Sequence, residues 1–139
     1  MYLDEPKKDF WVLTFKTWIK DNIINAQLIF DKGSPVDCID YGKSRDKSMP
    51  NWGEIVSIYL LPQYFDKGYG NRLLKKALLD LKQDGYLGTY LWVLKENQQA
   101  RHFYEKNNFK CTEDEYSCKI MNKQLTDIRY IYSFNDSLE

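Results

Sequence analysis

The sequence predicts a mixed α/β fold, in which a sheet is flanked by helices. The main observation is the stretch from Gly53 to Phe109, where the hydrophobic period changes from strand to helix, to strand, and to helix again. A second observation is a pair of short β-rich runs earlier in the chain, separated by turn residues, which predicts a hairpin. A chain of 139 residues is expected to form one domain, residues 1–139, with a single core.

The N-terminal section mixes apolar residues with Lys and Asp at helix-like spacing, which predicts an amphipathic helix from about Lys7 to Lys20. Such a helix is expected to cover one side of the sheet; the alternative is an exposed face that docks a partner. Ala26 to Phe30 is then a short strand, and Val36 to Tyr41 is the second strand of a hairpin. The second strand is expected to start after Pro35, because proline cannot donate a hydrogen bond inside a sheet.

A polar loop that contains proline is expected from Lys43 to Trp52. The next strand, from Glu54 to Leu61, is rich in β-branched and aromatic residues and stops at Pro62. After a short loop, Gln63 to Lys67, and the sequence Gly-Tyr-Gly, the apolar residues from Asn71 onward take a helical period. They form one stripe: Leu73, Leu74, Ala77, Leu78 and Leu81.

Glycine and asparagine residues set the limits of the elements that follow. Asp84-Gly85 is expected to end the first helix because glycine readily takes the left-handed conformation that ends helices. Gly88 to Leu94 has the composition of a buried strand. Asn97 is a good N-cap, so a second helix is expected to run through Lys106.

Charge and composition exclude several classes of function. The chain has 20 basic and 20 acidic residues and no dense Lys/Arg block, which argues against a nucleic-acid partner. The sequence contains no apolar run long enough to span a membrane and no signal-peptide pattern, so a cytoplasmic protein is expected. Three cysteines without CxxC spacing favour free thiols in a reducing compartment, and no cluster of metal ligands is apparent.

The turn Gly68-Tyr69-Gly70, between a strand and a helix, has the features of an anion site. The first amides of a helix have no partner within it, and glycine lets a ligand approach the backbone closely. A phosphate or pyrophosphate is the obvious ligand, although a plain turn explains two glycines equally well. A dinucleotide fingerprint would need a third glycine where the chain has Leu73, and no Walker loop occurs.

Three segments resemble signatures of the GNAT (Gcn5-related N-acetyltransferase) family. The family's acetyl-coenzyme A loop, Arg/Gln-x-x-Gly-x-Gly/Ala, matches FDKGYG at residues 65–70, with Phe65 in place of the usual Arg or Gln. A second signature, Asn-x-x-Ala-x-x-Phe-Tyr, matches NQQARHFY at residues 97–104, and Asn108 stands where the family has Gly before Phe. The segment LTDIRY at residues 125–130 is similar to a common final strand of the family. The three matches occur in the family's order, which makes them far more specific together than singly.

The resemblance implies a GNAT-like fold, a mixed and mainly antiparallel sheet flanked by helices. Within it, the Glu54 strand and the Gly88 strand would run parallel and splay apart. The family usually begins with a strand and a helix before the helix expected at Lys7, and this chain is short for both. The N-terminal strand and helix are therefore expected to be shortened, on the side where the family binds its acceptor. A homodimer, in which a partner chain completes the N-terminus, is one arrangement that would compensate.

The resemblance also implies acetyl-CoA as the cofactor. The pantetheine arm would lie between the splayed strands and pair with the backbone of Tyr59 to Leu61, and the pyrophosphate would contact the amides of Lys67 to Asn71. Phe65 removes one polar side chain near the phosphates but leaves these amides. The residues expected to bind the cofactor are Tyr59, Leu60, Leu61, Asp66, Lys67, Gly68, Tyr69, Gly70, Asn71, Asn97 and Tyr104.

Tyr104 is the leading catalytic candidate. In the family, the matching tyrosine points its hydroxyl at the coenzyme sulfur, so the resemblance implies that Tyr104 supplies a proton to the departing thiolate. The alternative is a packing role, since the chain has eleven tyrosines. His102 lies two residues earlier, about 200° around the helix, and is expected to face solvent away from Tyr104.

Glu54 is the candidate general base. It precedes Gly68 by fourteen residues, the spacing of the catalytic Glu in the histone-acetylating branch of the family. A carboxylate there could deprotonate the incoming ammonium group, directly or through water. An ordinary exposed Glu at the start of a strand explains the residue equally well. Strand alternation is expected to place Glu54 on one face with Val56, Ile58 and Leu60.

These expectations lead to an acetyl-CoA-dependent N-acetyltransferase that acts on a primary amine of a small molecule or peptide. The amine would attack the thioester directly in a ternary complex, because no cysteine is placed to form an acetyl-enzyme. Backbone amides of the Glu54 strand would polarise the carbonyl group. The alternative is a catalytically silent CoA-binding module that acts through protein contacts.

Overall fold

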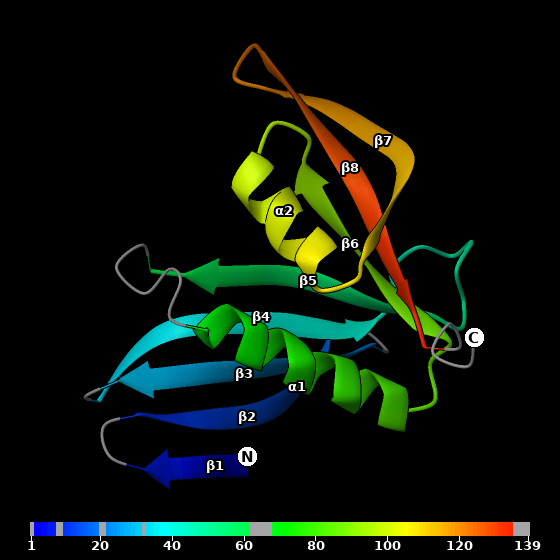
Figure 1. Ribbon diagram of the computed structural model, residues 1–139. Coiled ribbons are helices and arrows are strands. Elements are labelled where there is room, and N and C mark those ends of the chain that lie inside the picture. Colours follow the sequence, from blue (N-terminus) through cyan, green and yellow to red (C-terminus); the bar gives the residue numbers. More distant parts are fainter. Residues whose placement is uncertain (1, 8–9, 20–21, 32, 62–67, 135–139) are drawn as a thin grey trace.

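The computed structural model describes residues 2–7, 10–19, 22–31, 33–61 and 68–134. These residues form one eight-stranded sheet with the strand order β1-β2-β3-β4-β5-β6-β8-β7, and two helices (Figure 1). The elements in chain order are β1 (Tyr2–Lys7), β2 (Phe10–Ile19), β3 (Asn22–Asp31), β4 (Ser34–Lys43), β5 (Gly53–Leu60), α1 (Tyr69–Gln83), β6 (Gly88–Leu94), α2 (Gln98–Lys106), β7 (Lys110–Ile120) and β8 (Lys123–Ser133).

The predicted helix from about Lys7 to Lys20 is wrong, because the described residues of this segment belong to strands: Lys7 ends β1, and Phe10–Ile19 form β2. Strand β2 pairs antiparallel with β3 without interruption, from Phe10 opposite Asp31 to Ile19 opposite Asn22. The segment FWVLTFKTWI is rich in aromatic and β-branched residues, which fit a pleated sheet better than a helix. Apolar residues at nearly every second or third position satisfy both periods, so the spacing alone could not separate them.

The predicted hairpin between residues 26 and 41 is confirmed, with longer strands than expected. β3 and β4 pair antiparallel from Ile24 opposite Gly42 to Asp31 opposite Ser34. Pro35 lies inside β4, opposite Phe30, next to a shift in the register. Irregular pairing of this kind is one of the few places where a sheet tolerates proline.

The splayed parallel pair implied by the family resemblance is present. β5 and β6 pair in parallel at only two positions, Gly53 with Thr89 and Glu54 with Tyr90, and then separate. The other pairings between described strands are antiparallel, including β6 with β8. The divergence leaves the part of β5 beyond Glu54 unpaired on the side that faces β6.

A β-bulge in β5 overturns the predicted alternation of its side chains. Tyr41 of β4 lies opposite Ile55, and Asp40 lies opposite Ser57. Val56 is therefore an extra residue that has no partner residue in β4. Such an insertion shifts the later side chains to the other face. As a result Ile55 and Ile58 both pack on the hydrophobic core, whereas Glu54 points to the opposite face.

Helix α1 covers one face of the sheet and supplies much of the core. Its apolar stripe was predicted from the sequence, and Leu73, Leu74, Ala77 and Leu81 are fully buried against the sheet. The helix ends at Asp84, and Gly85 follows with φ +92°, as predicted. Figure 1 shows α1 in front of β3 and β4, and α2 above it, beside β6. Among the described residues, no helix has both the length and the apolar character needed to cross a bilayer.

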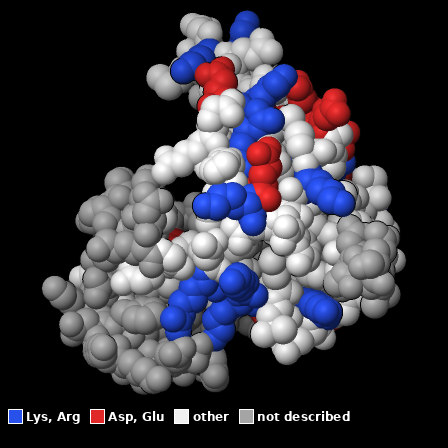
Figure 2. Space-filling model, viewed as in Figure 1, with Lys and Arg blue, Asp and Glu red and all other residues white. Residues whose placement is uncertain are grey.

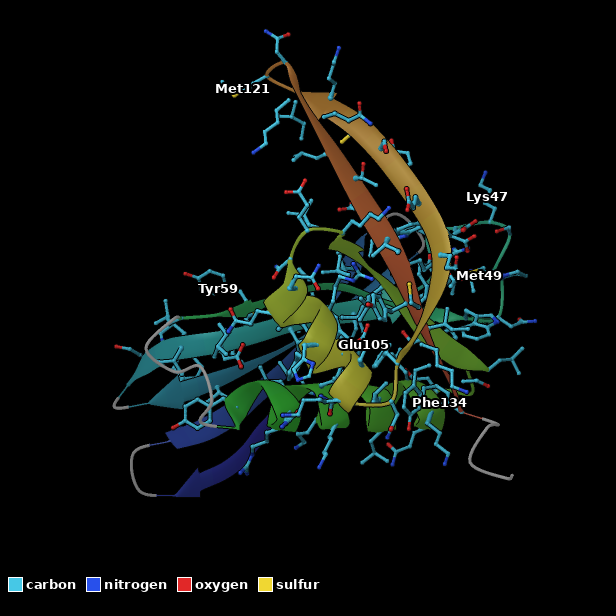
Figure 3. The ribbon with its side chains drawn as sticks, turned by 45° about the horizontal axis from the view of Figure 1, so that its top comes forward. Lys47, Met49, Tyr59, Glu105, Met121 and Phe134 are labelled. Carbon is cyan, nitrogen blue, oxygen red and sulfur yellow. The ribbon has the colours of Figure 1, made fainter. Side chains whose placement is uncertain are left out.

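The sheet ends in an arm formed by β7 and β8. The two strands are joined by a tight turn at Met121 and Asn122, and the arm extends well beyond the helices (Figure 1). Met121 lies at its tip (Figure 3). β7 is an edge strand of the sheet, and most of its residues are exposed.

Candidate active site

The N-terminus of α1 is open to an anion. Gly68 is the N-cap residue, with φ +83°, and as a glycine it has no side chain to make a capping hydrogen bond. The first turn contains no acidic residue. Its amides, together with the helix dipole, therefore offer partial positive charge to a ligand. Asp66 and Lys67, which were predicted to help, lie outside the described residues.

A cleft of about 760 Å³ lies beside this helix end, between the outer part of β5, the first half of α1, and α2. Figure 3 marks Tyr59 on the outer part of β5 and Glu105 on α2. The cleft brings together many of the residues predicted to bind the cofactor: Tyr59, Leu60, Gly68, Gly70, Asn71, Asn97 and Tyr104. Leu61 and Tyr69 do not line it, because their side chains pack against the hydrophobic core.

Gly70 allows the two helices on either side of the cleft to approach each other. A Cβ atom at this position would lie 3.3 Å from Cζ of Phe103 in α2. The Asn107 amide also donates a hydrogen bond to Oδ1 of Asn71, with an N–O distance of 2.8 Å. The anion site on α1 and the catalytic candidate on α2 are thus held in a fixed relation.

Asn97 caps α2, as predicted: its side-chain oxygen accepts a hydrogen bond from the Ala100 amide at 3.1 Å. Tyr104 lies two turns later on the same helix and lines the cleft. Its ring packs against the rings of Phe103, Phe109 and Tyr130, with centroids 5.4, 5.9 and 6.3 Å away. Aromatic neighbours on three sides fix the direction of the phenol.

Burial raises the pKa of Tyr104 to about 12. The cause is desolvation, which disfavours the charged phenolate. The Tyr104 hydroxyl makes no hydrogen bond to any residue that the structure describes. Tyr104 is therefore a neutral phenol near neutral pH, with its proton available to a ligand in the cleft.

Glu54 does not line the cleft. It forms the last parallel pair before β5 and β6 diverge, and its carboxylate lies on the face of the sheet opposite α1. Arg45 binds this carboxylate with its Nε, Nη2 and backbone N–H, and the Tyr90 hydroxyl donates to Oε1 at 3.2 Å. The structure thus places Glu54 at the apex of the gap, but on the other side from Tyr104.

Several residues that line the cleft were not predicted, notably Lys75, Lys106 and His102. His102 is exposed, as expected, and it also lines the cleft that Tyr104 lines. The cleft follows α2 along its length, and its rim therefore takes in residues from more than one helical face. Figure 2 shows basic side chains over α1 and near α2, which suits a ligand with several phosphates.

The sequence profile of the acetyltransferase (GNAT) family matches residues 2–109. The chain belongs to the GNAT acetyltransferase family. GNAT relatives include a spermidine N(1)-acetyltransferase of Thermoplasma acidophilum, which is 29% identical over 88% of this chain and 89% of that protein. An N-alpha-acetyltransferase of Saccharolobus solfataricus is 37% identical over 52% of this chain, and over 46% of its own length.

Solved GNAT structures share the fold. A Staphylococcus aureus N-acetyltransferase has a TM-score of 0.70 at 19% identity, covering 79% of this chain and 67% of that one. PaiA of Thermoplasma acidophilum, solved with coenzyme A, has a TM-score of 0.61 at 25% identity, covering 78% and 61%. Arabidopsis thaliana NAA60 with acetyl-CoA has a TM-score of 0.70 at 15% identity, covering 81% and 77%.

The GNAT assignment confirms the predicted fold class, the enzyme class and the cofactor: the chain is an acetyl-CoA-dependent acetyltransferase. The residues present fit this cofactor. The N-terminus of α1, where Gly68 offers no capping side chain, suits a pyrophosphate, and the edge of β5 that faces away from β4 suits an extended arm that carries amide groups.

Proposed function

We propose that this acetyltransferase transfers the acetyl group to a primary amine by direct attack in a ternary complex. The observation that carries the proposal is the apex where β5 and β6 diverge, with Glu54 on one face and the cleft on the other. A thioester held in the cleft would reach the apex from the helix side. An amine that approaches from the Glu54 side would meet it there without crossing the cofactor.

The cofactor would be held mainly by backbone groups. The amides at the start of α1, from Gly68 to Asn71, would bind the pyrophosphate, and the position of Gly68 at the N-terminus of the helix supports this role. The backbone of Tyr59 and Leu60 would pair with the pantetheine arm along the free edge of β5. Lys75 and Lys106 line the same cleft and would add charge complementarity to the phosphates.

Tyr104 would act at the departing sulfur. Because its phenol keeps its proton near neutral pH, it can donate a hydrogen bond to the thiolate that forms when the C–S bond breaks. Full proton transfer from an acid with a pKa of about 12 is uphill unless the thiolate is also desolvated. A cleft that excludes water would meet this condition.

Glu54 would act on the amine side as the general base. Its carboxylate is already engaged with Arg45 and Tyr90, so a bridging water is the simpler route for the ammonium proton. The bulge at Val56 lies next to the point where β5 and β6 diverge. A backbone N–H group of this irregular segment would polarise the carbonyl group of the thioester.

The acceptor to test first is a polyamine, because the relative from Thermoplasma acidophilum that aligns over 88% of this chain is named a spermidine acetyltransferase. Peptide N-termini come second, on the strength of the relative named an N-alpha-acetyltransferase. A silent CoA-binding module remains the competing function. It is favoured by Phe65, which replaces the family's usual polar residue.

The first experiment is thermal unfolding with and without millimolar acetyl-CoA. Binding to the folded state alone stabilises it by about 2.7 kcal/mol at a hundredfold excess over Kd. Release of free thiol is then followed with spermidine, aminoglycosides and peptide N-termini as acceptors. Stabilisation together with thiol release supports the enzyme, and stabilisation without turnover on any amine supports the silent module. Lines that intersect in a two-substrate analysis support a ternary complex, and parallel lines contradict it.

Tyr104→Phe tests the assignment of the acid. Turnover should fall by roughly tens- to thousands-fold, while the stabilisation by acetyl-CoA is kept. Tyr116→Phe is the matched control, because Tyr116 lies on the arm and is 63% exposed. If Tyr104→Phe turns over as fast as the control, Tyr104 has no part in the chemistry.

A further inference from the structure

The outer edge of β7 is a long unpaired strand edge. β7 ends the sheet on one side, and its outer half, from Glu115 to Ile120, pairs regularly with β8 alone. A bulge interrupts the pairing only nearer the body, between Cys111 and Glu115. Exposed edges of this kind readily pair with another strand unless charge or irregularity prevents it.

The turn at the tip fixes which backbone groups face outward. Met121 and Asn122 both have positive φ, at 51° and 67°, which is typical of a two-residue type I′ turn. The closing pair, Ile120 with Lys123, is then hydrogen-bonded within the arm, and the pattern alternates along β7. The N–H and C=O groups of Glu115, Ser117 and Lys119 therefore point away from β8, to the open edge.

Charge is distributed unevenly along this edge. Glu113, Asp114 and Glu115 lie near the body, and Lys119 and Lys123 lie near the tip. Figure 2 shows the same separation, with basic side chains at the top of the arm and acidic ones lower on its β7 side. The ammonium group of Lys119 has no ion-pair partner among the described residues.

We propose that β7 pairs antiparallel with β7 of a second copy of this chain, about a two-fold axis at Ser117. This register places Glu115 of each copy opposite Lys119 of the other. The paired segment therefore has an attractive pair of opposite charges at each end. It also matches outward-facing backbone groups with one another, since Ser117 meets Ser117 and Glu115 meets Lys119. The two sheets then form one continuous sheet across the dimer.

Apolar side chains support the same register on the opposite face of the arm. Tyr116 and Ile120 are large hydrophobic residues that are 63% and 52% exposed. About an axis at Ser117, Tyr116 lies opposite Cys118 of the second copy and diagonal to its Ile120. Pairing thus covers apolar surface that the single chain leaves in water. Glu115 already binds Lys95 at 2.6 Å, and a carboxylate has the capacity to accept from a second ammonium group.

The test is the oligomeric state by sedimentation equilibrium, from micromolar to about 100 μM protein. The wild-type chain should form a dimer that dissociates on dilution. Lys119→Glu places like charges opposite each other twice in the dimer, so its dissociation constant should rise about tenfold or more. Lys82→Glu makes the same charge change in the last turn of α1, outside β7 and β8, and should leave the dimer unaffected.

A mixing experiment distinguishes specific pairing from a general effect of charge. Glu115→Lys should also weaken the dimer, but an equimolar mixture of the Lys119→Glu and Glu115→Lys chains should associate as well as the wild type. Each heterodimer restores two opposite-charge pairs. A wild-type chain that stays monomeric at every concentration overturns the proposal. So does a dimer that neither charge reversal weakens, because it must use another surface.

Disulfide cross-linking fixes the register. About Ser117, residue 116 of one copy lies opposite residue 118 of the other, so Tyr116→Cys should cross-link to the native Cys118 under mild oxidation. A wild-type dimer that cross-links through Cys118 alone places the axis at Cys118 instead and overturns the proposed register. Neither readout depends on acetyl transfer.

Discussion

The carboxylate of Glu54 and the guanidinium of Arg45 form a two-point ion pair, with Nη2–Oε2 at 2.7 Å and Nε–Oε1 at 3.0 Å. The two partners differ greatly in burial: the Glu54 side chain is 4% exposed and the Arg45 side chain is 58% exposed. A buried anion at the apex of the active-site gap is thus neutralised by a cation from a surface loop. This arrangement links the loop after β4 to the position where chemistry is proposed to occur.

Arg45→Met should destabilise the fold, because it leaves the buried Glu54 carboxylate with only the Tyr90 hydroxyl and one backbone N–H as partners. The free energy of unfolding in urea should fall by about 1–3 kcal/mol, nearer the lower value because Arg45 is largely exposed to water. Lys43→Met, at an exposed position, is the control and should change little. An Arg45→Met chain as stable as the control would mean that water replaces the guanidinium at no cost.

Asp37 should make stability depend on pH. Its side chain lies in β4 and is 2% exposed, and its Oδ2 atom has no hydrogen-bond partner among the described residues. Burial raises the pKa of Asp37 from 3.8 to about 7. An acid whose pKa is raised on folding stabilises the protein fully below pH 4, and this contribution is lost as pH rises toward 7.

Asp37→Asn should therefore be more stable than the wild type at pH 8, by as much as about 4 kcal/mol. The difference should shrink toward pH 4, because the wild-type carboxyl is then protonated in the folded protein and partly protonated in the unfolded chain. Urea denaturation at pH 4, 6 and 8 measures it. If the difference is the same at all three values, Asp37 does not titrate in this way in the folded protein.

A buried hydrogen-bond chain joins α1 to the sheet. Nε2 of Gln27 donates to the Tyr41 hydroxyl at 2.7 Å, and this hydroxyl donates to Oδ2 of Asp80 at 2.8 Å. Tyr41 and Gln27 are both buried, so Tyr41→Phe leaves the Gln27 amide without a partner. The free energy of unfolding should fall by about 1–3 kcal/mol.

The double variant Gln27→Leu/Tyr41→Phe is the control for this chain. Replacing both buried partners by apolar groups removes the unsatisfied amide, so the double variant should lose less stability than the sum of the single changes. Additive losses would show that the two groups do not interact.

Helices and strands whose ends are marked by particular residues nearby in the sequence could be predicted. Gly88–Leu94 and the N-cap at Asn97 agree with the structure to the residue, because glycine, asparagine and a buried apolar run act within a few positions. Strand β2 failed because its identity depends on pairing with β3, and its apolar residues satisfied a helical period as well.

The site was predictable in part for the same reason. Gly68 and Tyr104 stand in short motifs, and the structure brings both to one cleft. The ion pair of Glu54 with Arg45 was not predictable, because it depends on how the loop after β4 folds back. The bulge at Val56 has no sequence signal such as glycine, and it reversed the faces assigned to Ile58 and Leu60.

Two glycines at opposite ends of α1 separate a loss of stability from a loss of cofactor binding. Gly68 has φ +83° and Gly85 has φ +92°, and a Cβ atom at either would meet no atom of the described residues within 4 Å. Replacement by alanine therefore costs backbone strain alone at both positions, about 1 kcal/mol each. Only Gly68, however, lies in the cleft, at the helix end that is open to an anion.

Gly68→Ala and Gly85→Ala should thus lower the unfolding midpoint of the free protein by similar amounts. With millimolar acetyl-CoA, the Gly85→Ala chain should be stabilised as much as the wild type, and the Gly68→Ala chain much less, because the new methyl group obstructs the approach of the pyrophosphate to the backbone. Thermal unfolding of the three proteins with and without the cofactor measures both effects. Equal stabilisation of all three would place the pyrophosphate away from the N-terminus of α1.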